Sequence, residues 1–469
     1  MQNGSERSAR CGVGFSVGRG LALAFAIAAG LPAQEQPETG GDPEGLEQRA
    51  AVLSRHGITW HFDREYPFGT FANGDYWVLG PVQVVQIEPA CIEVDGRVRH
   101  GSMIDPDPSQ MLQGYDSHLF GDQKRERYRD ELNVGRGVST ERPLALAAGS
   151  SLISVESGSD PNRTPTLDGA AVLTCLAEQP APDAFRPPYV RGLAEDEALH
   201  YRAKDLDFEI FRRVKPTVDA PPIDVIASKF ERFWLDHFPE WPVRYAHPRN
   251  NMPDYGRDIG ALVGSGALAL NFDVDADQKR TLLIRMTQIG LDLHAALRVG
   301  CHWRGLGGHG HGRKLPILLA GMALHDERML AIGREFPSKL RAPGDGSHWF
   351  AEDGQTFYVR ETSPGVWNWG AGGYTRDYDG LAEWGFDHAS TTDGDNAVWD
   401  ANPYRRCCTA NGWVGQCLAA RMLGLQETWK HPAWFDYMDR YMQVKHTDDW
   451  HRSWIGWHAS MWDAYRANF

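Results

Sequence analysis

Residues 255–299 read YGRDIGALVGSGALALNFDVDADQKRTLLIRMTQIGLDLHAALRV. Apolar residues recur through this stretch at helical spacing, and a short polar connection interrupts them once. Small residues in its first half, among them Gly260, Gly264 and Gly266, let the backbone of one helix approach another closely. The stretch therefore predicts two consecutive helices, over 255–270 and 276–299.

Other segments with the same periodicity lie on both sides of this pair, separated by glycine-rich or polar loops. Consecutive antiparallel helices with functional loops at one end are typical of an (α/α) toroid, complete or incomplete. We expect such a helical domain over 181–469, although its period is too irregular to count as a sequence repeat. The further expected helices are 224–238, 315–325, 413–423 and 434–444.

The preceding part of the chain has short apolar or aromatic runs separated by turn residues, which indicates strands. Asn73-Gly74 and Asp95-Gly96 favour tight hairpin turns. We predict an antiparallel β domain over 57–180, with a long polar loop at 105–142. The fold class is therefore α+β multidomain, an N-terminal antiparallel β domain followed by the toroid. The expected strand regions are 60–62, 76–79, 82–87, 91–98, 144–156 and 170–176.

The N-terminus has the pattern of an export signal. Three arginines precede the apolar run LALAFAIAAGL at 21–31, which is too short to cross a bilayer, and Leu-Pro-Ala at 31–33 offers a cleavage site. We therefore predict a signal peptide over 1–33, an acidic Gly- and Pro-containing linker over 34–56, and a periplasmic or secreted protein. No later segment is long and apolar enough to hold the mature chain in a membrane.

Charge and cysteine content narrow the class of protein. The formal net charge of −14 argues against nucleic acid as a partner, because phosphate contacts need a basic face. Seventeen tryptophans suit stacking on sugar rings. No CxxC pattern is present. We expect adjacent Cys407 and Cys408 not to pair with each other, and leave open that one of them bridges Cys417.

Residues 302–314 read HWRGLGGHGHGRK, a cationic and titratable run within an acidic chain. His309 and His311 share a face if the loop is extended, and Arg313 adds a charge that suits an anion. His302 would be a third ligand of a metal, but only Cys301 offers a further ligand at an obvious spacing. We therefore predict proton transfer or carboxylate binding here, with no metal and no cofactor; the alternative is a solvated glycine-rich turn.

Residues 245–258 read YAHPRNNMPDYGRD and precede the first helix of the central pair. Asn and Asp at this position are ordinary helix caps. Capping alone does not require two asparagines, two arginines and a tyrosine together. We therefore select Asn250, Asn251 and Arg257 as candidates for binding substrate.

Residues 367–387 read WNWGAGGYTRDYDGLAEWGFD. Tyr374 and Tyr378 are neighbours whether the segment is extended or helical, and Arg376 lies between them. A tyrosine beside Arg or His loses its proton more readily than a free phenol. Trp367 and Trp369 are candidates for stacking on sugars; the alternative is an aromatic-rich corner of the core.

Residues 404–411 read YRRCCTAN, which again places cationic and aromatic groups just before an apolar helix. We expect Arg405 and Arg406 to be solvated at the surface. The alternative is that one of them lines the same cleft as the segments above.

Tyr, His, Asn and Arg on a helical toroid resemble the arrangement in toroidal alginate, glucuronan and related polysaccharide lyases, over roughly residues 220–469. Such lyases remove the proton at C5 of a uronate and expel the leaving oxygen by β-elimination. Donors stabilise the charge that develops on the carboxylate. The N-terminal position of the β domain departs from those lyases that carry a β-sandwich after the helices.

The resemblance implies an anionic polysaccharide as the substrate. It makes Tyr374 or Tyr378 the acid and base. His309 or His311 becomes a second base or neutralising group, and Asn251 and Arg257 surround the carboxylate. Further substrate contacts are expected from Asn250, Arg313, Arg376, Trp367 and Trp369.

The alternative enzyme is a glycoside hydrolase on the same toroid, using carboxylates from Asp377, Asp379, Glu383 and Asp387. An inverting pair needs about 6.5–9.5 Å between its carboxyl groups. Neighbours on one helix rarely reach that separation, so a second carboxylate, Asp258 or Asp395, would be required. A non-catalytic carbohydrate-binding or cell-envelope protein is the third class.

Overall fold

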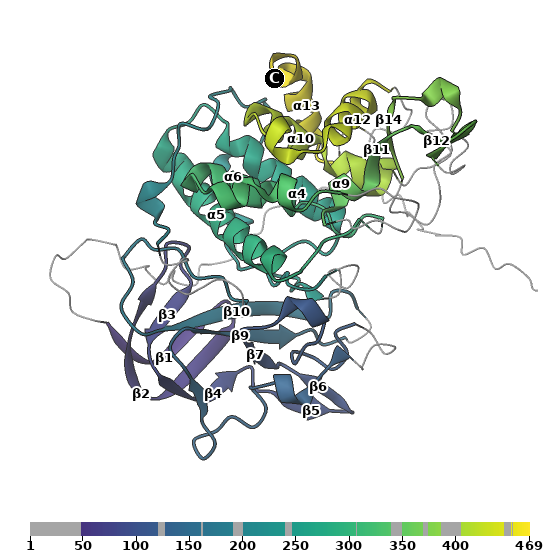
Figure 1. Ribbon diagram of the computed structural model, residues 1–469. Helices are drawn as coiled ribbons and strands as arrows, with labels where there is room; N and C mark the ends of the chain where they lie inside the picture. Colours follow the sequence, from purple (N-terminus) through teal and green to yellow (C-terminus); the bar gives the residue numbers. More distant parts are fainter. Residues whose placement is uncertain are drawn as a thin grey trace, which may run out of the picture. The chain divides into compact units, whose positions relative to one another are not determined.

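The computed structural model describes residues 48–120, 127–160, 163–190, 200–239, 246–305, 307–338, 349–368, 374–385, 405–444, 452 and 454–469. Strands dominate the first part of the chain and helices the second, so the predicted α+β order is confirmed (Figure 1). The predicted signal peptide and residues 34–47 of the predicted linker lie outside the described residues. The rest of the predicted linker is different: residues 49–55 form a strand.

The main sheet has eight strands in the order β7-β9-β10-β3-β2-β4-β8, with β1 paired to β2. Its pairs are antiparallel except one, β10 with β3, which is parallel. The prediction of a purely antiparallel domain is therefore wrong at this pair. The strands are β1 (Arg49–Arg55), β2 (Ile58–Thr70), β3 (Tyr76–Leu79), β4 (Val82–Glu88), β7 (Ser102–Ile104), β8 (Leu144–Leu146), β9 (Ser150–Ser157) and β10 (Leu167–Leu176).

Two residues of a tight turn separate β5 (Ile92–Val94) from β6 (Arg97–Arg99), which form a separate hairpin. Asp95 and Gly96 make this turn with φ values of 52° and 73°. Positive φ at both central residues is the conformation that an Asp-Gly pair favours, so the turn predicted from the sequence is confirmed. The region predicted as a long loop, 105–142, contains short 3₁₀ turns and one isolated β-bridge, Gln113 with Tyr128, within its described residues.

Five helices lie close to the ranges that periodicity predicted, 224–238 is helical only in its first part, and the remaining helices of the described residues were not predicted. Asp275 caps α5 by a reciprocal pair of hydrogen bonds with Gln278, a capping box. The α-helices of the described residues are α2 (Ile223–Ser228), α4 (Gly256–Leu270), α5 (Ala276–Arg298), α6 (Lys314–Leu324), α7 (Glu327–Leu330), α8 (Ile332–Glu335), α9 (Ala351–Gln355), α10 (Val414–Met422), α11 (Gln426–Trp429), α12 (Pro432–Gln443) and α13 (Gly456–Tyr465).

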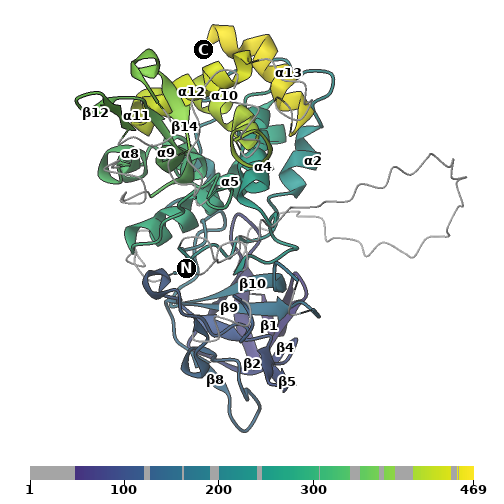
Figure 2. The same ribbon diagram turned by 90° about the vertical axis from the view of Figure 1, so that its right-hand side faces the viewer.

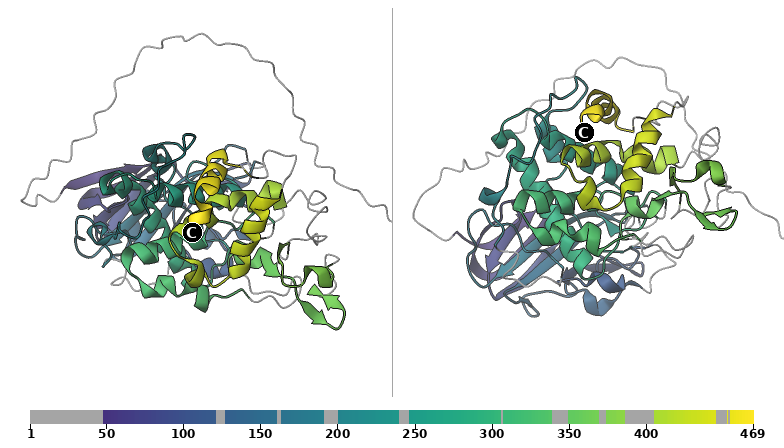
Figure 3. Two further views of the ribbon diagram at one scale, coloured as in Figure 1. Left: turned by 90° about the horizontal axis from the view of Figure 1, so that it is seen from above. Right: turned by 45° about the horizontal axis from the view of Figure 1, so that its top comes forward.

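Glycines set how closely these helices approach. A Cβ on Gly264 of α4 would lie 2.6 Å from the backbone nitrogen of Gln416 in α10, and one on Gly290 of α5 would lie 2.3 Å from the carbonyl oxygen of Pro316 in α6. Either substitution would push two helices apart. Helix α10 also packs against α13, next to it in Figure 3. Among the described helices, none has the length and apolarity needed to cross a membrane.

Two small two-stranded sheets interrupt the part predicted as helical. Strand β11 (Thr356–Tyr358) pairs with β14 (Ala382–Trp384), and β12 (Glu361–Ser363) pairs with β13 (Val366–Trp367). The β11–β14 pair packs against α12. Between β13 and β14, the described residues from Tyr374 onward carry both candidate tyrosines and include a short 3₁₀ turn at Arg376–Tyr378.

The strands and helices share one core. Alternate residues of the central strands point to opposite faces of the sheet. Leu152 and Leu173 belong to a hydrophobic cluster made by strand residues on one face, whereas Ile153 and Val172 belong to the cluster on the other face that contains the helices. Figure 2 shows β9 and β10 beside α5. Residues Glu47–Phe469 accordingly form one compact unit, so the boundary predicted at 180 does not separate independent bodies.

Candidate functional site

The glycine-rich run packs directly against the start of α4. The backbone N–H of Arg257 donates to Gly308 O at 3.0 Å. A Cβ on Gly256 would lie 2.0 Å from the carbonyl oxygen of His309, and one on Gly308 would lie 2.3 Å from Tyr255 Oη. Glycine at both positions is therefore required for this approach. As a result, the half-buried rings of Tyr255 and His309 meet edge to face, with centroids 5.4 Å apart.

Arg257 completes this group, which we call the Tyr255–His309–Arg257 cluster. Its guanidinium donates to the carbonyl oxygen of Cys407 at 2.8 Å and to Asp258 Oδ1 at 2.8 Å. The same group lies over the exposed ring of Trp454, 3.2 Å from its centroid. Asn411 Nδ2 donates to the same carbonyl of Cys407 at 3.2 Å. The guanidinium carbon also lies 5.5 Å from the centroid of the Tyr255 ring, so a planar cation is fixed beside the phenol.

Cys407 and Cys408 form a disulfide with each other, so the prediction that they do not pair is wrong. They lie in a π-helical turn, Arg405–Thr409, that runs alongside the glycine loop. Cys417, the alternative partner, is a free thiol buried in α10. Burial raises the pKa of this thiol to about 12, so it stays protonated.

His311 is fully enclosed, unlike His309. Trp413 Nε1 can only donate, and it donates to His311 Nδ1 at 3.1 Å. The ring proton is therefore assigned to Nε2, which donates to Gln355 Oε1 at 2.9 Å. Gln355 in turn donates to Gly307 O at 2.6 Å. Burial lowers the pKa of His311 to about 3, so this histidine is neutral. Its side chain supports the loop and has no contact with solvent.

The next two cations of the run are also internal. Arg313 donates to Asp236 Oδ2 at 2.7 Å, and both side chains are buried. Lys314 donates to Asp353 Oδ2 at 2.5 Å and to Trp429 O at 2.7 Å. Because Arg313 has no access to solvent, we do not retain it, or His311, as a group that contacts substrate.

Glu352 ties the far side of the loop to α10. Its Oε1 accepts from the backbone N–H of Gly312 at 2.7 Å and from Gln416 Nε2 at 3.0 Å. Its Oε2 is buried without a hydrogen-bond partner among the described residues. Burial raises the pKa of Glu352, as expected for a carboxyl group that loses its hydration.

Tyr374 belongs to a second, mostly enclosed group around Glu383. Its hydroxyl donates to Glu383 Oε2 at 3.1 Å, and Arg405 donates to the same oxygen at 3.3 Å. Arg440 lies 3.6 Å from Glu383 Oε1. Tyr378 packs edge-on against Tyr374 with ring centroids 5.7 Å apart, so the two tyrosines are neighbours as predicted. Tyr374 is only 8% exposed.

The expectation that Arg405 and Arg406 are solvated is wrong. Arg405 is fully buried and Arg406 is 3% exposed. Their segment connects the two groups, because Arg405 binds Glu383 while the carbonyl of Cys407 accepts from Arg257. The segments around His309 and Tyr374 are therefore both in contact with the Arg405–Thr409 turn.

Asn251 does not join them. Its amide donates to Ala170 O at 2.9 Å and to Phe233 O at 2.7 Å, and it is 3% exposed. It fastens β10 to the helical part and is not retained as a substrate contact. Asn250 is exposed, and its backbone N–H donates to Asp168 O.

The remaining candidates are distributed over the surface or lie beyond the described ranges. Arg376, Asp377 and Asp379 are exposed. Trp367 is half-buried on β13, and Asp258 is paired with Arg257. Predicted residues Trp369, Asp387 and Asp395 lie outside the described residues.

The glycine-rich run does not assemble a metal site from described residues. No group of three or more His, Cys, Asp and Glu in that part of the chain has a suitable arrangement. His302 Nδ1 lies 3.3 Å from Gly300 O, and its ring packs edge-on against Trp349.

Sequence reasoning missed two members of this region. Tyr255 stood in a selected segment but was passed over for its neighbours, although its place just before a helix was a usable signal. Asn411 gave no comparable signal, because its role depends on the fold of the Cys407–Cys408 turn.

Comparison of the chain with protein-family models, with curated proteins and with solved structures gave no match.

Proposed function

We propose that this protein is a polysaccharide lyase that cleaves a uronic-acid-containing polysaccharide by β-elimination at the Tyr255–His309–Arg257 cluster. One observation carries the proposal: a half-buried phenol and imidazole meet with ring centroids 5.4 Å apart, and a fixed guanidinium lies 5.5 Å from the centroid of the phenol ring. The helices around them are proposed to form an incomplete (α/α) toroid. The N-terminal sequence supports export to the periplasm or the medium.

The three groups match the demands of the reaction. The proton at C5 is weakly acidic until the charge that develops on the neighbouring carboxylate is stabilised. A guanidinium has five N–H donors, and Arg257 uses three of them on Asp258 and Cys407. The remaining donors are available to the uronate carboxylate.

Acid and base work falls to the other two groups. In this proposal the imidazole of His309 takes the C5 proton, and the hydroxyl of Tyr255 delivers a proton to the leaving oxygen. General acid–base groups typically accelerate such steps by about 10²–10⁴-fold each. Trp454, exposed beside Arg257, offers a face for a sugar ring.

The catalytic phenol is therefore proposed to be Tyr255, in place of Tyr374 or Tyr378. The hydroxyl of Tyr374 donates a hydrogen bond to Glu383, a buried carboxylate that also has Arg405 as a partner. That arrangement supports a role for Tyr374 in holding the β11–β14 segment to the Cys407–Cys408 turn. The hydrolase alternative loses Glu383, which is fully buried, and would depend on the exposed carboxylates of Asp377 and Asp379.

The test is incubation of the purified protein with alginate, glucuronan, pectate and glycosaminoglycans, followed by the ultraviolet absorbance of an unsaturated uronate. Tyr255→Phe keeps the ring packing and removes only the hydroxyl. We expect its kcat to fall by about 10²–10⁴-fold, and that of His309→Gln by a similar factor.

Tyr378→Phe is the matched control, because Tyr378 is also half-buried but lies outside the cluster. It should keep nearly normal activity. New reducing ends without the absorbance would identify a hydrolase instead. Full activity in Tyr255→Phe, or its loss only in Tyr378→Phe, would refute the assignment of the phenol.

A further inference from the structure

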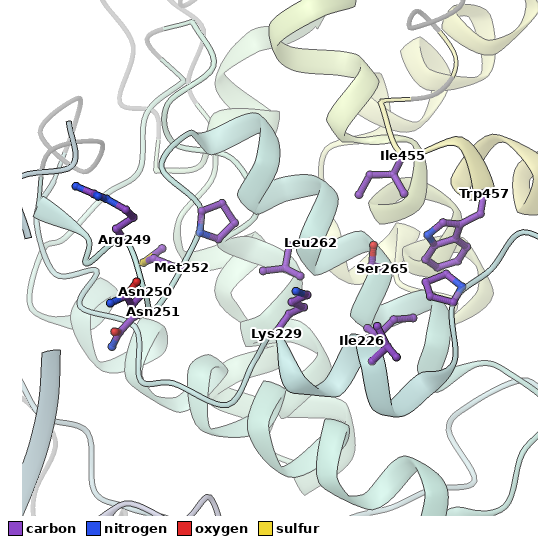
Figure 4. A pocket seen from close by; sticks show the side chains of 13 residues that line it. Ile226, Lys229, Arg249, Asn250, Asn251, Met252, Leu262, Ser265, Ile455 and Trp457 are labelled. Carbon is purple, nitrogen blue, oxygen red and sulfur yellow. The ribbon is translucent and has the colours of Figure 1, made fainter. Parts of the chain in front are cut away.

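A cavity of about 430 Å³ opens between α2, the segment leading into α4, and the start of α13 (Figure 4). This volume is within the range of about 300–1,000 Å³ that small-molecule sites occupy. None of its lining residues belongs to the Tyr255–His309–Arg257 cluster. The cavity is therefore a candidate binding site in its own right.

One end of the cavity is apolar. Ile226, Ile455 and Trp457 line it, and Leu262 of α4 continues the apolar wall toward the middle. Burying such side chains against an apolar ligand gains roughly 25 cal/mol for each Å² removed from water. This end therefore favours a hydrocarbon chain or ring.

Ser265 does not add polarity to this wall. Its hydroxyl lies 3.1 Å from Ala261 O, one turn earlier in the helix, and 2.8 Å from His458 Nε2. The single hydroxyl proton goes to Ala261, so the imidazole N–H donates to the serine oxygen. Burial lowers the pKa of His458 to about 3, which keeps that ring neutral. The pair links α4 to α13 through this hydrogen bond.

The other end of the cavity is cationic. Lys229 extends toward Leu262, and Arg249 and Asn250 lie beyond it. Arg249 is balanced by Asp168 at 3.1 Å. Lys229 is exposed and has no ion-pair partner among the described residues. No Asp or Glu of the described chain lines the cavity.

We propose that this cavity binds a monocarboxylate with an apolar chain, such as a medium-chain fatty acid. The carboxylate lies at Lys229, and the chain extends toward Ile226, Ile455 and Trp457. The combination of an apolar wall with an unopposed ammonium group selects an acid over an alcohol or an amine of the same length. The site is independent of the proposed lyase chemistry.

The experiment compares binding of octanoate, octanol and octylamine to the full protein by isothermal titration calorimetry. We expect octanoate to bind most tightly and octylamine most weakly. Lys229→Gln should weaken octanoate about two- to fivefold, the effect of a partly exposed ion pair, and leave octanol unchanged. Lys204→Gln, which removes an exposed lysine elsewhere, is the matched control.

A second variant tests the apolar end without depending on charge. Leu262→Trp, at a half-buried position, fills the cavity and should abolish binding of both octanoate and octanol. Circular dichroism confirms that this variant is folded. The proposal is overturned if octanoate does not bind the wild type. Equal binding to Leu262→Trp, or octylamine binding as tightly as octanoate, overturns it as well. So does displacement of octanoate from the cavity by a uronate oligomer that binds there more tightly.

Discussion

Replacing Arg186 with Met should destabilise the whole unit. Arg186 is fully buried where the strand-rich and helical parts meet, and it donates to Asp75 at 2.8 Å and to Asp292 at 2.5 Å. Methionine removes the close partner of both carboxylates: Asp292 is left buried without a counter-ion, and Asp75 keeps only the more distant Arg55, at 3.9 Å. Breaking a buried pair from one side typically costs about 3–5 kcal/mol. We expect the free energy of unfolding to fall by that amount.

The assay is urea unfolding followed by far-ultraviolet circular dichroism and by tryptophan fluorescence. Both signals should change in one transition, because the sheet and the helices share a core. The control is Arg213→Met. Arg213 also pairs with an aspartate at 2.8 Å, but the side chains of Arg213 and Asp273 are 68% and 56% exposed. Such a pair contributes about 1 kcal/mol or less.

A double variant separates the ion pair from general packing. In Arg186→Met/Asp292→Asn one of the two orphaned charges is gone, so the loss should be smaller than the sum of the two single losses. The reasoning is refuted if Arg186→Met and Arg213→Met lose similar stability. Two separate transitions in the wild type would refute the single shared core.

Three further predictions concern buried titratable groups. Burial raises the pKa of Asp292 to about 6 from 3.8, so the folded state holds this proton more tightly than the unfolded state does. Its contribution to stability is therefore lost as the pH rises between those values. Measured against Asp292→Asn, the free energy of unfolding of the wild type should decline by about 3 kcal/mol over that range, and a flat difference would contradict this. His237 is enclosed by aromatic rings, and burial lowers its pKa to about 3. Since a histidine with a lowered pKa costs stability as the pH falls below its ordinary value, His237→Phe should resist acid better by roughly 1.4 kcal/mol per pH unit below about 6.5. The test is the free energy of unfolding of both proteins at neutral pH and near pH 5; the same change with pH in His237→Phe and in the wild type would contradict this. Burial raises the pKa of Glu352, and Glu352→Gln, which keeps the acceptor for the backbone N–H of Gly312, should be as stable as the wild type near neutral pH. Glu352→Ala loses that acceptor and should lower the free energy of unfolding by about 1–3 kcal/mol in thermal or urea unfolding. Equal losses in both variants would argue against this role.

Much of the fold could be predicted because the signals are local. Helices α4 and α5 follow the apolar periodicity of 255–299 to within a residue or two, and the Asp95-Gly96 turn follows from its two residues. Segment 224–238 failed this rule. Its apolar residues contact the shared core from an irregular chain after Ser228, because burial alone does not require a helix.

The candidate site was predictable only in part. The sequence selected the glycine-rich run and Arg257 as candidates, and the structure places the two segments in contact, with the backbone N–H of Arg257 donating to Gly308 O. It did not distinguish His309, half-buried beside Tyr255, from His311, which Trp413 and Gln355 enclose. These partners come from segments some 40 to 100 residues away, and no local pattern specifies them.

The sequence by itself determined the order of strands and helices, the acidic character of the chain and the segments that carry titratable groups, because periodicity, charge and glycine placement are properties of neighbouring residues. The tertiary structure alone decided which of those groups reach solvent. Asp236 and Asp353 neutralise Arg313 and Lys314 inside the protein, while the approach of α4 to Gly308 brings Tyr255 to His309. The physical reason is that burial and ion pairing depend on contacts between distant segments, and those exist only once the chain has folded.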